Sequence, residues 1–293
     1  MAKQVLGIIG GSGVYDIPDL GNARWETVAS PWGTPSDQLR RGEIDGLPLV
    51  FLPRHGRGHV HSPTDIPYLA NIDALKRAGV TMIVSLSACG SFREEMPPGS
   101  FALVDQFVDR TFARPKSFFG AGCVAHVGLA HPVSPMVQGQ VRAAMSAETI
   151  PHTVGGTYLC MEGPQFSTLA ESRLYRDVWK CDVVGMTAMP EAKLAREAEI
   201  PYATIAMVTD FDSWHPDHDH VDVAAVMAVM RGNVETARRL ILRLARALPR
   251  ETEPCPIGSD RALETAIMTA PDKRDPALLA KLDAVAGRVL RKA

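Results

Sequence analysis

The chain has 293 residues, of which 46% are hydrophobic and 22% are charged, so it is long enough to bury one large core or two ordinary ones. Its 31 Lys and Arg residues against 33 Asp and Glu residues give a formal net charge of −2 without a basic block, which argues against nucleic acid or an anionic membrane as a partner. The five cysteines are widely spaced without a C-x-x-C pair, and no apolar run approaches the roughly 20 residues that span a bilayer. We therefore expect a cytoplasmic protein, with no membrane segment, that acts on small molecules.

Strand-like and helical patterns alternate along the chain. Short apolar runs predict strands at 5–9, 47–52, 80–88, 101–105, 181–186 and 202–208. Periodic apolar residues predict helices at about 65–78, 137–148, 168–179 and 190–199. A longer helix is expected from about 222 to 248, with one face that we expect in the core: Val226, Met230, Val234, Ala237, Ile241 and Leu244. The fold class is therefore α/β.

Prolines in the segment ALPRETEPCPIGS, residues 247–259, interrupt this last helical pattern. A charged, helical-looking tail follows. We expect one domain over residues 1–250 and a helical C-terminal extension over 251–293, packed on the same domain or on a neighbouring subunit.

The first strand leads into a glycine-rich turn. Gly10, Gly11 and Gly13 allow backbone angles that let amide groups converge on an anion. A dinucleotide fingerprint would need a third glycine where Asp16 stands, and no GK[ST] follows to make a P-loop. From these residues alone the turn is a bare anion site, a weak dinucleotide site or a plain tight turn.

Polar side chains collect where predicted strands end, and in α/β sheets ligands bind at such ends. Arg54 offers a fork of N–H donors, His55 another donor, and hydroxyls occur at Ser12, Ser87 and Thr187. This mixture suits a tetrahedral oxyanion such as phosphate. The alternatives are a solvated surface turn for the charged pair, and caps or turns for the hydroxyl residues.

Two carboxylates end the strand of the segment AMVTDFDSWHPDHDH. Asp210 and Asp212 would point the same way if the segment stayed extended, so both could meet one ligand. Paired carboxylates shift each other's proton affinity, so one could stay protonated and serve as an acid. Otherwise both cap or solvate a loop.

The histidines that follow, His215, His218 and His220, alternate with Asp217 and Asp219 and so could suggest a metal site. They lack the helical H-E-x-x-H spacing and a cysteine partner. We expect a loop over a pocket here, and no metal.

Eight motifs stand in the order found in one family: GIIGGSG, PRHGRGH, ANIDALKRAGV, SACGSFREE, DQFVDRT, EGPQFS, GMTAMPEA and TDFDSW. Over about residues 4 to 245 the chain resembles the trimeric purine nucleoside phosphorylase family, in its branch that acts on 5'-methylthioadenosine. The resemblance implies a single domain with a central mixed β-sheet flanked by helices, of the phosphorylase/hydrolase-like kind. It also implies a homotrimer that uses no organic cofactor or metal and cleaves the nucleoside with inorganic phosphate, giving adenine and 5-methylthioribose 1-phosphate in methionine and purine salvage.

The resemblance also implies roles for individual residues. Phosphate would be held by Ser12, Arg54, His55, Ser87 and Thr187, with Ala88 on the ribose and phosphate side. Met186 would pack beneath the ribose and Phe166 against the purine. Ser167 stands where relatives that prefer 6-oxopurines carry a glutamate.

By the same carry-over, Asp210 is the catalytic acid. A protonated Asp210 could donate to N7 of adenine and accept from its 6-amino group, with Asp212 supporting the contact from the amine side. Val221 and Val223 align with residues that receive the methylthio group, and His126 with a histidine reaching in from a neighbouring subunit.

Three rival functions stay open from the sequence. A nucleotide- or dinucleotide-binding module would use the glycine turn without phosphorolysis. A phosphorylase for methylthioinosine or inosine is opposed by Asp210 and Ser167. Turnover without phosphate would indicate a hydrolase.

Overall fold

A computed structural model describes residues 2–11, 13–14, 16–17, 19–216 and 223–291. The strands are β1 (Leu6–Gly10), β2 (Gly21–Glu26), β3 (Leu39–Ile44), β4 (Leu47–Pro53), β5 (Met82–Ser91), β6 (Phe101–Val104), β7 (Gln106–Asp109), β8 (His152–Val154), β9 (Thr157–Cys160), β10 (Val183–Gly185) and β11 (Tyr202–Asp210). The α-helices are α1 (Tyr68–Arg77), α2 (Pro135–Ala147), α3 (Leu169–Arg173), α4 (Ala188–Glu197), α5 (Val223–Ala247), α6 (Pro276–Lys281) and α7 (Gly287–Leu290). A π-helical turn, η1 (Leu174–Val178), continues α3, and short 3₁₀ turns occupy Ser259–Arg261 and Pro271–Lys273.

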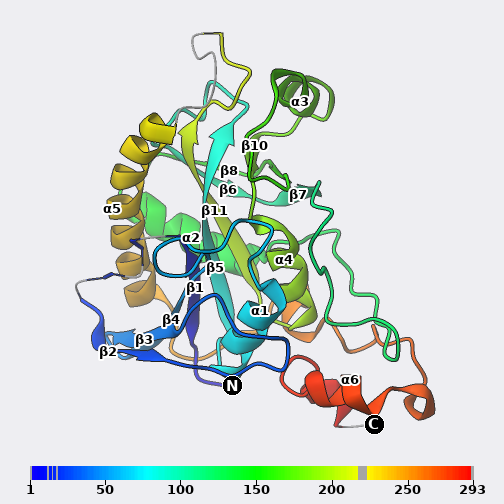
Figure 1. Cartoon of the computed structure of the whole chain (residues 1–293). Helices are drawn as coiled ribbons and strands as arrows, with labels where there is room; N and C mark the ends of the chain where they lie inside the picture. Colours follow the sequence, from blue (N-terminus) through cyan, green and yellow to red (C-terminus); the bar gives the residue numbers. More distant parts are fainter. Residues whose placement is uncertain (1, 12, 15, 18, 217–222, 292–293) are drawn as a thin grey trace.

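All strands of the described residues join one mixed sheet, whose main path runs β2-β3-β4-β1-β5-β10-β9-β7 (Figure 1). β11 pairs in parallel with the long strand β5 and antiparallel with β6, which in turn pairs with β8. β1 lies parallel to both β4 and β5. The carboxyl ends of β4, β1, β5 and β11 therefore meet at one edge of the sheet.

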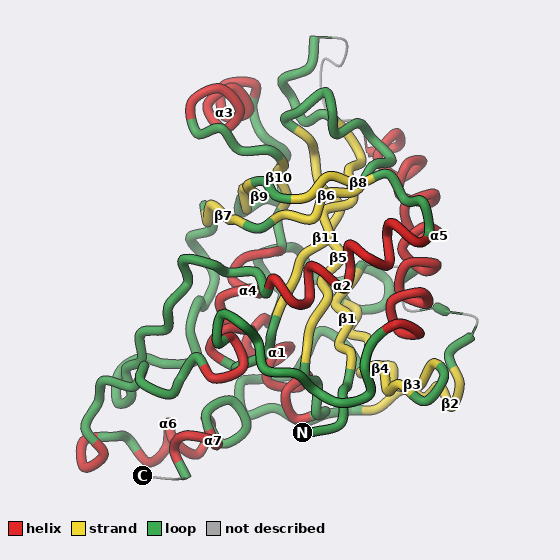
Figure 2. The backbone as a smooth tube through the Cα atoms, turned by 180° about the vertical axis from the view of Figure 1, so that it is seen from behind, coloured by secondary structure: helices red, strands yellow, loops and turns green. Residues whose placement is uncertain are grey.

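Helices cover both faces of this sheet, as Figures 1 and 2 show from opposite sides. α1 and α4 pack on one face and share a core with residues such as Ile72, Ala192 and Tyr202. α2 and α5 pack on the other, around residues such as Val137 and Ile241. The predicted fold, a mixed α/β domain with a central sheet flanked by helices, is confirmed.

The predicted strands and the five predicted helices are present, with shifted ends. The sequence did not reveal β2, β3, β7, β8 and β9. The expectation that one whole face of α5 is core is confirmed for its second half, whereas Met230 and Val234 of the first half pack against that core without being fully buried. Ala237, Ile241 and Leu244 are buried, whereas Val226, Met230 and Val234 are only partly buried.

The C-terminal segment packs on the rest of the chain. Leu263, Leu282 and Val285 join the core that α1 and α4 share. The backbone N–H of Met268 donates to the Val124 carbonyl at 2.8 Å. The division at residue 250 stays a prediction.

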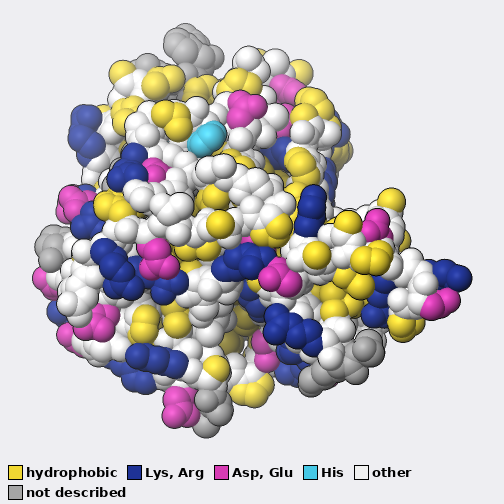
Figure 3. Space-filling model, turned by 60° about the horizontal axis from the view of Figure 1, so that its bottom comes forward, with side chains coloured by type: hydrophobic (Ala, Val, Ile, Leu, Met, Phe, Trp, Pro, Cys, Tyr) yellow, Lys and Arg dark blue, Asp and Glu magenta, His cyan; other side chains and the backbone are white. Residues whose placement is uncertain are grey.

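In the part of the chain that the structure describes, no helix is long and apolar enough to cross a membrane. The face drawn in Figure 3 carries Lys and Arg side chains interspersed with Asp and Glu, without a block of one sign. This distribution agrees with the near-zero net charge of the sequence.

Candidate active site

A cavity of about 650 Å³ lies at the sheet edge where β4, β1, β5 and β11 end, and the first half of α5 closes one side. Ligands in α/β proteins bind at such an edge. The residues that the sequence assigned to the site and that line this cavity are Arg54, His55, Ser87, Ala88, Phe166, Met186, Thr187, Asp210 and Asp212. The fold thus brings together residues that lie more than 150 positions apart in the sequence.

The glycine turn borders the cavity through Gly11 and Gly13. Gly13 has a φ of +94°, a conformation that L side chains rarely adopt, so glycine is required there. Arg238 of α5 donates to the Gly13 carbonyl from Nε at 3.0 Å and from Nη2 at 2.7 Å. α5 therefore holds the turn as well as walling the cavity.

Arg54 follows β4 directly and is buried. Its Nε and Nη2 donate to Glu191 at 2.9 and 3.2 Å, its Nη2 also donates to Ser85 Oγ at 2.6 Å, and its Nη1 donates to the Leu86 carbonyl at 2.8 Å. Most of the guanidinium donors are therefore committed within the protein, and the side chain meets the cavity in one fixed orientation.

His55 lies beside it. Its Nδ1 is 2.9 Å from the carbonyl oxygen of His61, which can only accept, so Nδ1 carries a hydrogen. The ring stacks on that of His59 with centroids 4.1 Å apart. Burial and the nearby Arg54 charge lower the pKa of His55 to about 4. At neutral pH the ring is uncharged, and Nε2 is a hydrogen-bond acceptor.

The two hydroxyls from β5 and α4 are neighbours. Ser87 Oγ lies 3.3 Å from Thr187 Oγ1 and 2.9 Å from the hydroxyl of buried Tyr158. Thr187 is the N-cap residue of α4, but its side chain makes no capping bond, so the hydroxyl is available to a ligand. Ala88 is exposed within an otherwise buried strand because it faces the cavity.

The carboxylates of Asp210 and Asp212 also line the cavity, at the end of β11, where the strand bulges before Asp210. Asp210 accepts from the Thr209 hydroxyl at 2.7 Å through Oδ2 and from the Asp212 backbone N–H at 2.8 Å through Oδ1. Asp212 has a φ of 51° and is 3% exposed. Burial raises the pKa of Asp212 to about 6, and the Asp210 charge adds to the effect. The pair therefore has a raised affinity for a proton, and the role of Asp210 as the donor stays a prediction.

The carboxylates leave no room for a side chain on the adjoining strand. A Cβ at Gly90 would lie 2.7 Å from Asp210 Oδ1 and 3.1 Å from Asp212 Cβ. Glycine at this position of β5 therefore lets the acid pair approach the sheet.

Apolar side chains form the rest of the lining. Met161, Phe166 and Met186 border it, and Phe166 is 44% exposed. From α5 come Val226, Met227, Met230 and Val234, which the sequence had not assigned to the site. Val226, Met230 and Val234 are partly buried because they border the cavity, and their helical spacing alone cannot distinguish a cavity wall from core.

Three predicted residues do not line the cavity of their own chain. Val223 is 60% exposed at the start of α5. Ser167 lies just behind the lining, with its carbonyl accepting from Ser213 Oγ at 2.7 Å. The backbone of His126 donates to Ala266 beside the C-terminal segment, so any role of His126 in catalysis stays a prediction.

Other assignments fall outside the described residues: Ser12, Val221, Asp217, His218, Asp219 and His220. Within the described ranges, no group of three His, Cys, Asp or Glu side chains could hold a metal ion.

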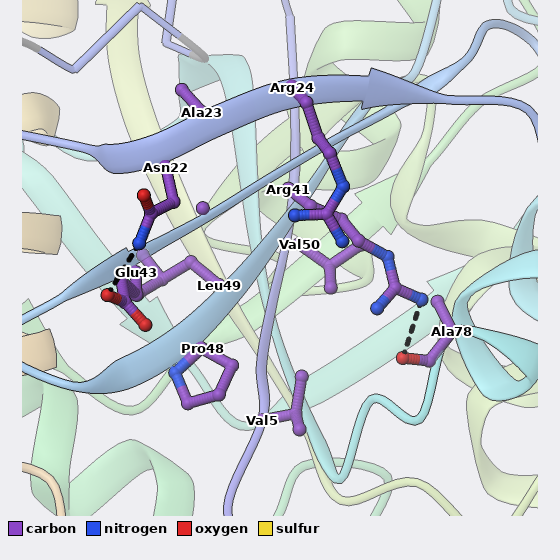
Figure 4. Close-up of a pocket in the computed structure, with 11 residues that line it drawn as sticks. Val5, Asn22, Ala23, Arg24, Arg41, Glu43, Pro48, Leu49, Val50 and Ala78 are labelled. Atoms are coloured by element: carbon purple, nitrogen blue, oxygen red, sulfur yellow. Dashed lines mark hydrogen bonds between the residues drawn. The ribbon is translucent and has the colours of Figure 1, made fainter.

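A second hollow, of about 710 Å³, lies against the β2–β3 ribbon (Figure 4). Arg24 and Arg41 reach over it, Arg41 Nη2 donates to the Ala78 carbonyl at 3.0 Å, and Asn22 donates to Glu43 at 2.9 Å. None of the residues predicted for the site lines this hollow, so it is not the candidate active site.

Comparisons with known proteins agree with the geometry. A family profile described as the phosphorylase superfamily matches residues 5–246. S-methyl-5'-thioadenosine phosphorylase of Bradyrhizobium diazoefficiens is 66% identical to the chain over 99% of it and 100% of its own length. A crystal structure of methylthioadenosine phosphorylase from an antarctic soil metagenomic library superposes with a TM-score of 0.89 at 41% identity, covering 97% of this chain and 99% of that one. A mutant of adenosine/methylthioadenosine phosphorylase from Schistosoma mansoni, solved in complex with methylthioadenosine, superposes with a TM-score of 0.77 at 34% identity, covering 85% and 93% of the two chains.

Proposed function

Because the chain belongs to the phosphorylase superfamily, we propose that it cleaves S-methyl-5'-thioadenosine with inorganic phosphate, giving adenine and 5-methylthioribose 1-phosphate. The observation that carries the proposal is the arrangement of one cavity. Oxyanion-binding groups at Arg54, Ser87 and Thr187 lie in it together with the carboxyl pair Asp210 and Asp212. This is a pentosyl transfer, in salvage of purine and methionine.

Phosphate binds among the hydroxyls of Ser87 and Thr187, with Arg54 behind them and Ala88 leaving space. His55 offers Nε2 as an acceptor, which suits the P–OH group of hydrogen phosphate. A phosphate oxygen attacks the anomeric carbon and forms the new C–O bond. The C–N bond to the purine breaks, and its electron pair leaves with the base.

The leaving base needs a proton to depart as neutral adenine. Asp210 is proposed to donate it at N7, and Asp212 accepts a hydrogen bond from the 6-amino group. Filling the cavity with nucleoside expels water, which further disfavours two charges on the pair and so favours its protonated form. Phe166 and Met186 bracket the purine and the ribose.

The 5' end of the nucleoside lies against the apolar side of α5. Val226, Met230 and Val234 offer a surface suited to a methylthio group rather than to a hydroxyl. One group of methylene size is worth only about 1 to 3 kcal/mol, so adenosine is expected to be a slower substrate.

Neither an organic cofactor nor a metal enters this reaction, and phosphate is a co-substrate. We place the enzyme in the cytoplasm, because all five cysteines are free thiols and buried.

A homotrimer is proposed from the family resemblance, in which His126 reaches the active site of a neighbouring subunit. Phe112 and Val178 are apolar side chains, 83% and 68% exposed, that such contacts could cover. Sedimentation should then give three times the chain mass.

The proposal is tested by incubating the enzyme with methylthioadenosine, adenosine or inosine, with and without phosphate, and separating the bases by chromatography. We expect phosphate-dependent release of adenine, fastest from methylthioadenosine. Equal release without phosphate would indicate a hydrolase, and faster release of hypoxanthine from inosine would indicate an oxopurine enzyme. Tight binding of NAD in a parallel titration would favour the dinucleotide alternative.

A further inference from the structure

Glu191 lies in the first turn of α4, below the cavity, and does not line it. Its side chain is 3% exposed, and its two oxygens face the guanidinium of Arg54 in a bidentate pair at 2.9 and 3.2 Å. We propose that Glu191 is a positioning residue of the phosphate site, which acts through Arg54 by fixing the direction of its N–H groups. The inference rests on the proposed function, because phosphate is the ligand that Arg54 would meet.

Further contacts hold Glu191 itself in place. Its Oε1 accepts from Ser85 Oγ at 2.5 Å and from the Tyr202 hydroxyl at 2.8 Å. Thr204 Oγ1 in turn donates to the Tyr202 hydroxyl at 2.7 Å. These partners lie on the paired strands β5 and β11, so the carboxylate is anchored to the middle of the sheet.

A count of donors shows what this anchoring leaves for a ligand. A guanidinium has five N–H groups in a fixed plane. In Arg54, Glu191 takes two, Ser85 a third and the Leu86 carbonyl a fourth. The fifth, on Nη1, has no partner among the described residues, and Arg54 borders the cavity. The network therefore presents a single N–H in one direction.

The direction of this Arg54 N–H matters because the charges around it nearly cancel. The carboxylate of Glu191 balances Arg54, and the low pKa of His55, about 4, leaves its ring neutral. Hydrogen phosphate thus enters a site without net positive charge from these groups, and directed N–H and O–H donors must supply its binding. A guanidinium free to turn would no longer hold its remaining N–H in one direction.

The test compares Glu191→Gln with Glu197→Gln. Glu197 is a matched control because it is a buried acid of the same helix that accepts from Ser117 Oγ and the Phe118 N–H, both at 2.7 Å, outside the cavity lining. In Glu191→Gln the new amide keeps one acceptor but turns an NH₂ group towards donors, so Arg54 loses part of its fork. We expect the KM for phosphate to rise at least tenfold in Glu191→Gln, while the KM for methylthioadenosine stays within about twofold.

A binding measurement without turnover separates this inference from the proposed function. Phosphate added to the nucleoside-free wild type should raise its Tm, and the same addition should shift Glu191→Gln much less and Glu197→Gln normally. An equal or lower phosphate KM in Glu191→Gln, with a normal phosphate-dependent Tm shift, would overturn the positioning role while leaving phosphorolysis intact. If Glu191→Gln does not fold, Ser85→Ala replaces it in the test, because Ser85 Oγ accepts from Arg54 and donates to Glu191. A phosphate KM raised at least threefold supports the proposal, and an unchanged one overturns it.

Discussion

Replacing Asp212 by Asn should change how stability depends on pH. Burial raises the pKa of Asp212 from 3.8 to about 6, so the folded protein binds a proton more tightly than the unfolded chain between these values. The contribution of the Asp212 carboxyl to the free energy of unfolding is therefore fully present below pH 3.8 and is lost as pH rises through about 6. Each pKa unit corresponds to about 1.4 kcal/mol, so the whole loss is about 3 kcal/mol.

Asn has no charge at any of these pH values, so the variant does not incur this loss. We expect its free energy of unfolding, relative to wild type, to improve by about 2 to 3 kcal/mol between pH 4 and pH 7. Urea denaturation at half-unit pH intervals measures the difference, and any pH-independent effect of the substitution cancels. Asp272→Asn, at a side chain 72% exposed, is the control and should follow the wild-type curve. Parallel curves for Asp212→Asn and wild type would refute the raised pKa.

Three further predictions concern turnover. Asp210→Ala should lower kcat by about 10²- to 10⁴-fold, the usual worth of a general acid, with little change in phosphate KM, and an unchanged kcat in steady-state assays would remove Asp210 from the mechanism. Gly90→Ala should lower kcat at least tenfold, because its Cβ would lie 2.7 Å from Asp210 Oδ1, and a normal rate would mean that the carboxylate can move without cost. Val226→His should shift the ratio of kcat/KM values from methylthioadenosine towards adenosine, whereas Val223→His, at an exposed position, should not; equal shifts in both would contradict the assigned 5' pocket.

The site residues that could be predicted from the sequence are those at the ends of strands. Arg54, Ser87 and Asp210 come at or near the ends of apolar runs, and parallel pairing of those runs brings the ends to one edge. Their convergence follows from local patterns plus the general rule for α/β sheets.

Partners of these residues could not be predicted in the same way. Glu191 meets Arg54 across 137 positions and Tyr158 meets Ser87 across 71, and nothing local marks either pair. Strands β2 and β3 carry charged and partly exposed residues, so they lack the apolar run that marks a buried strand. On α5, apolar periodicity identified the inward face but not which turns face the cavity.

In the proposed reaction phosphate, and not water, attacks the anomeric carbon. ³¹P NMR of the sugar product formed from [¹⁸O₄]phosphate tests this most directly, because each ¹⁸O bound to phosphorus shifts the resonance. We expect a sugar 1-phosphate that retains all four labelled oxygens, one of them bridging to carbon. A sugar product without phosphorus, or a bridging oxygen that carries no label, would contradict it.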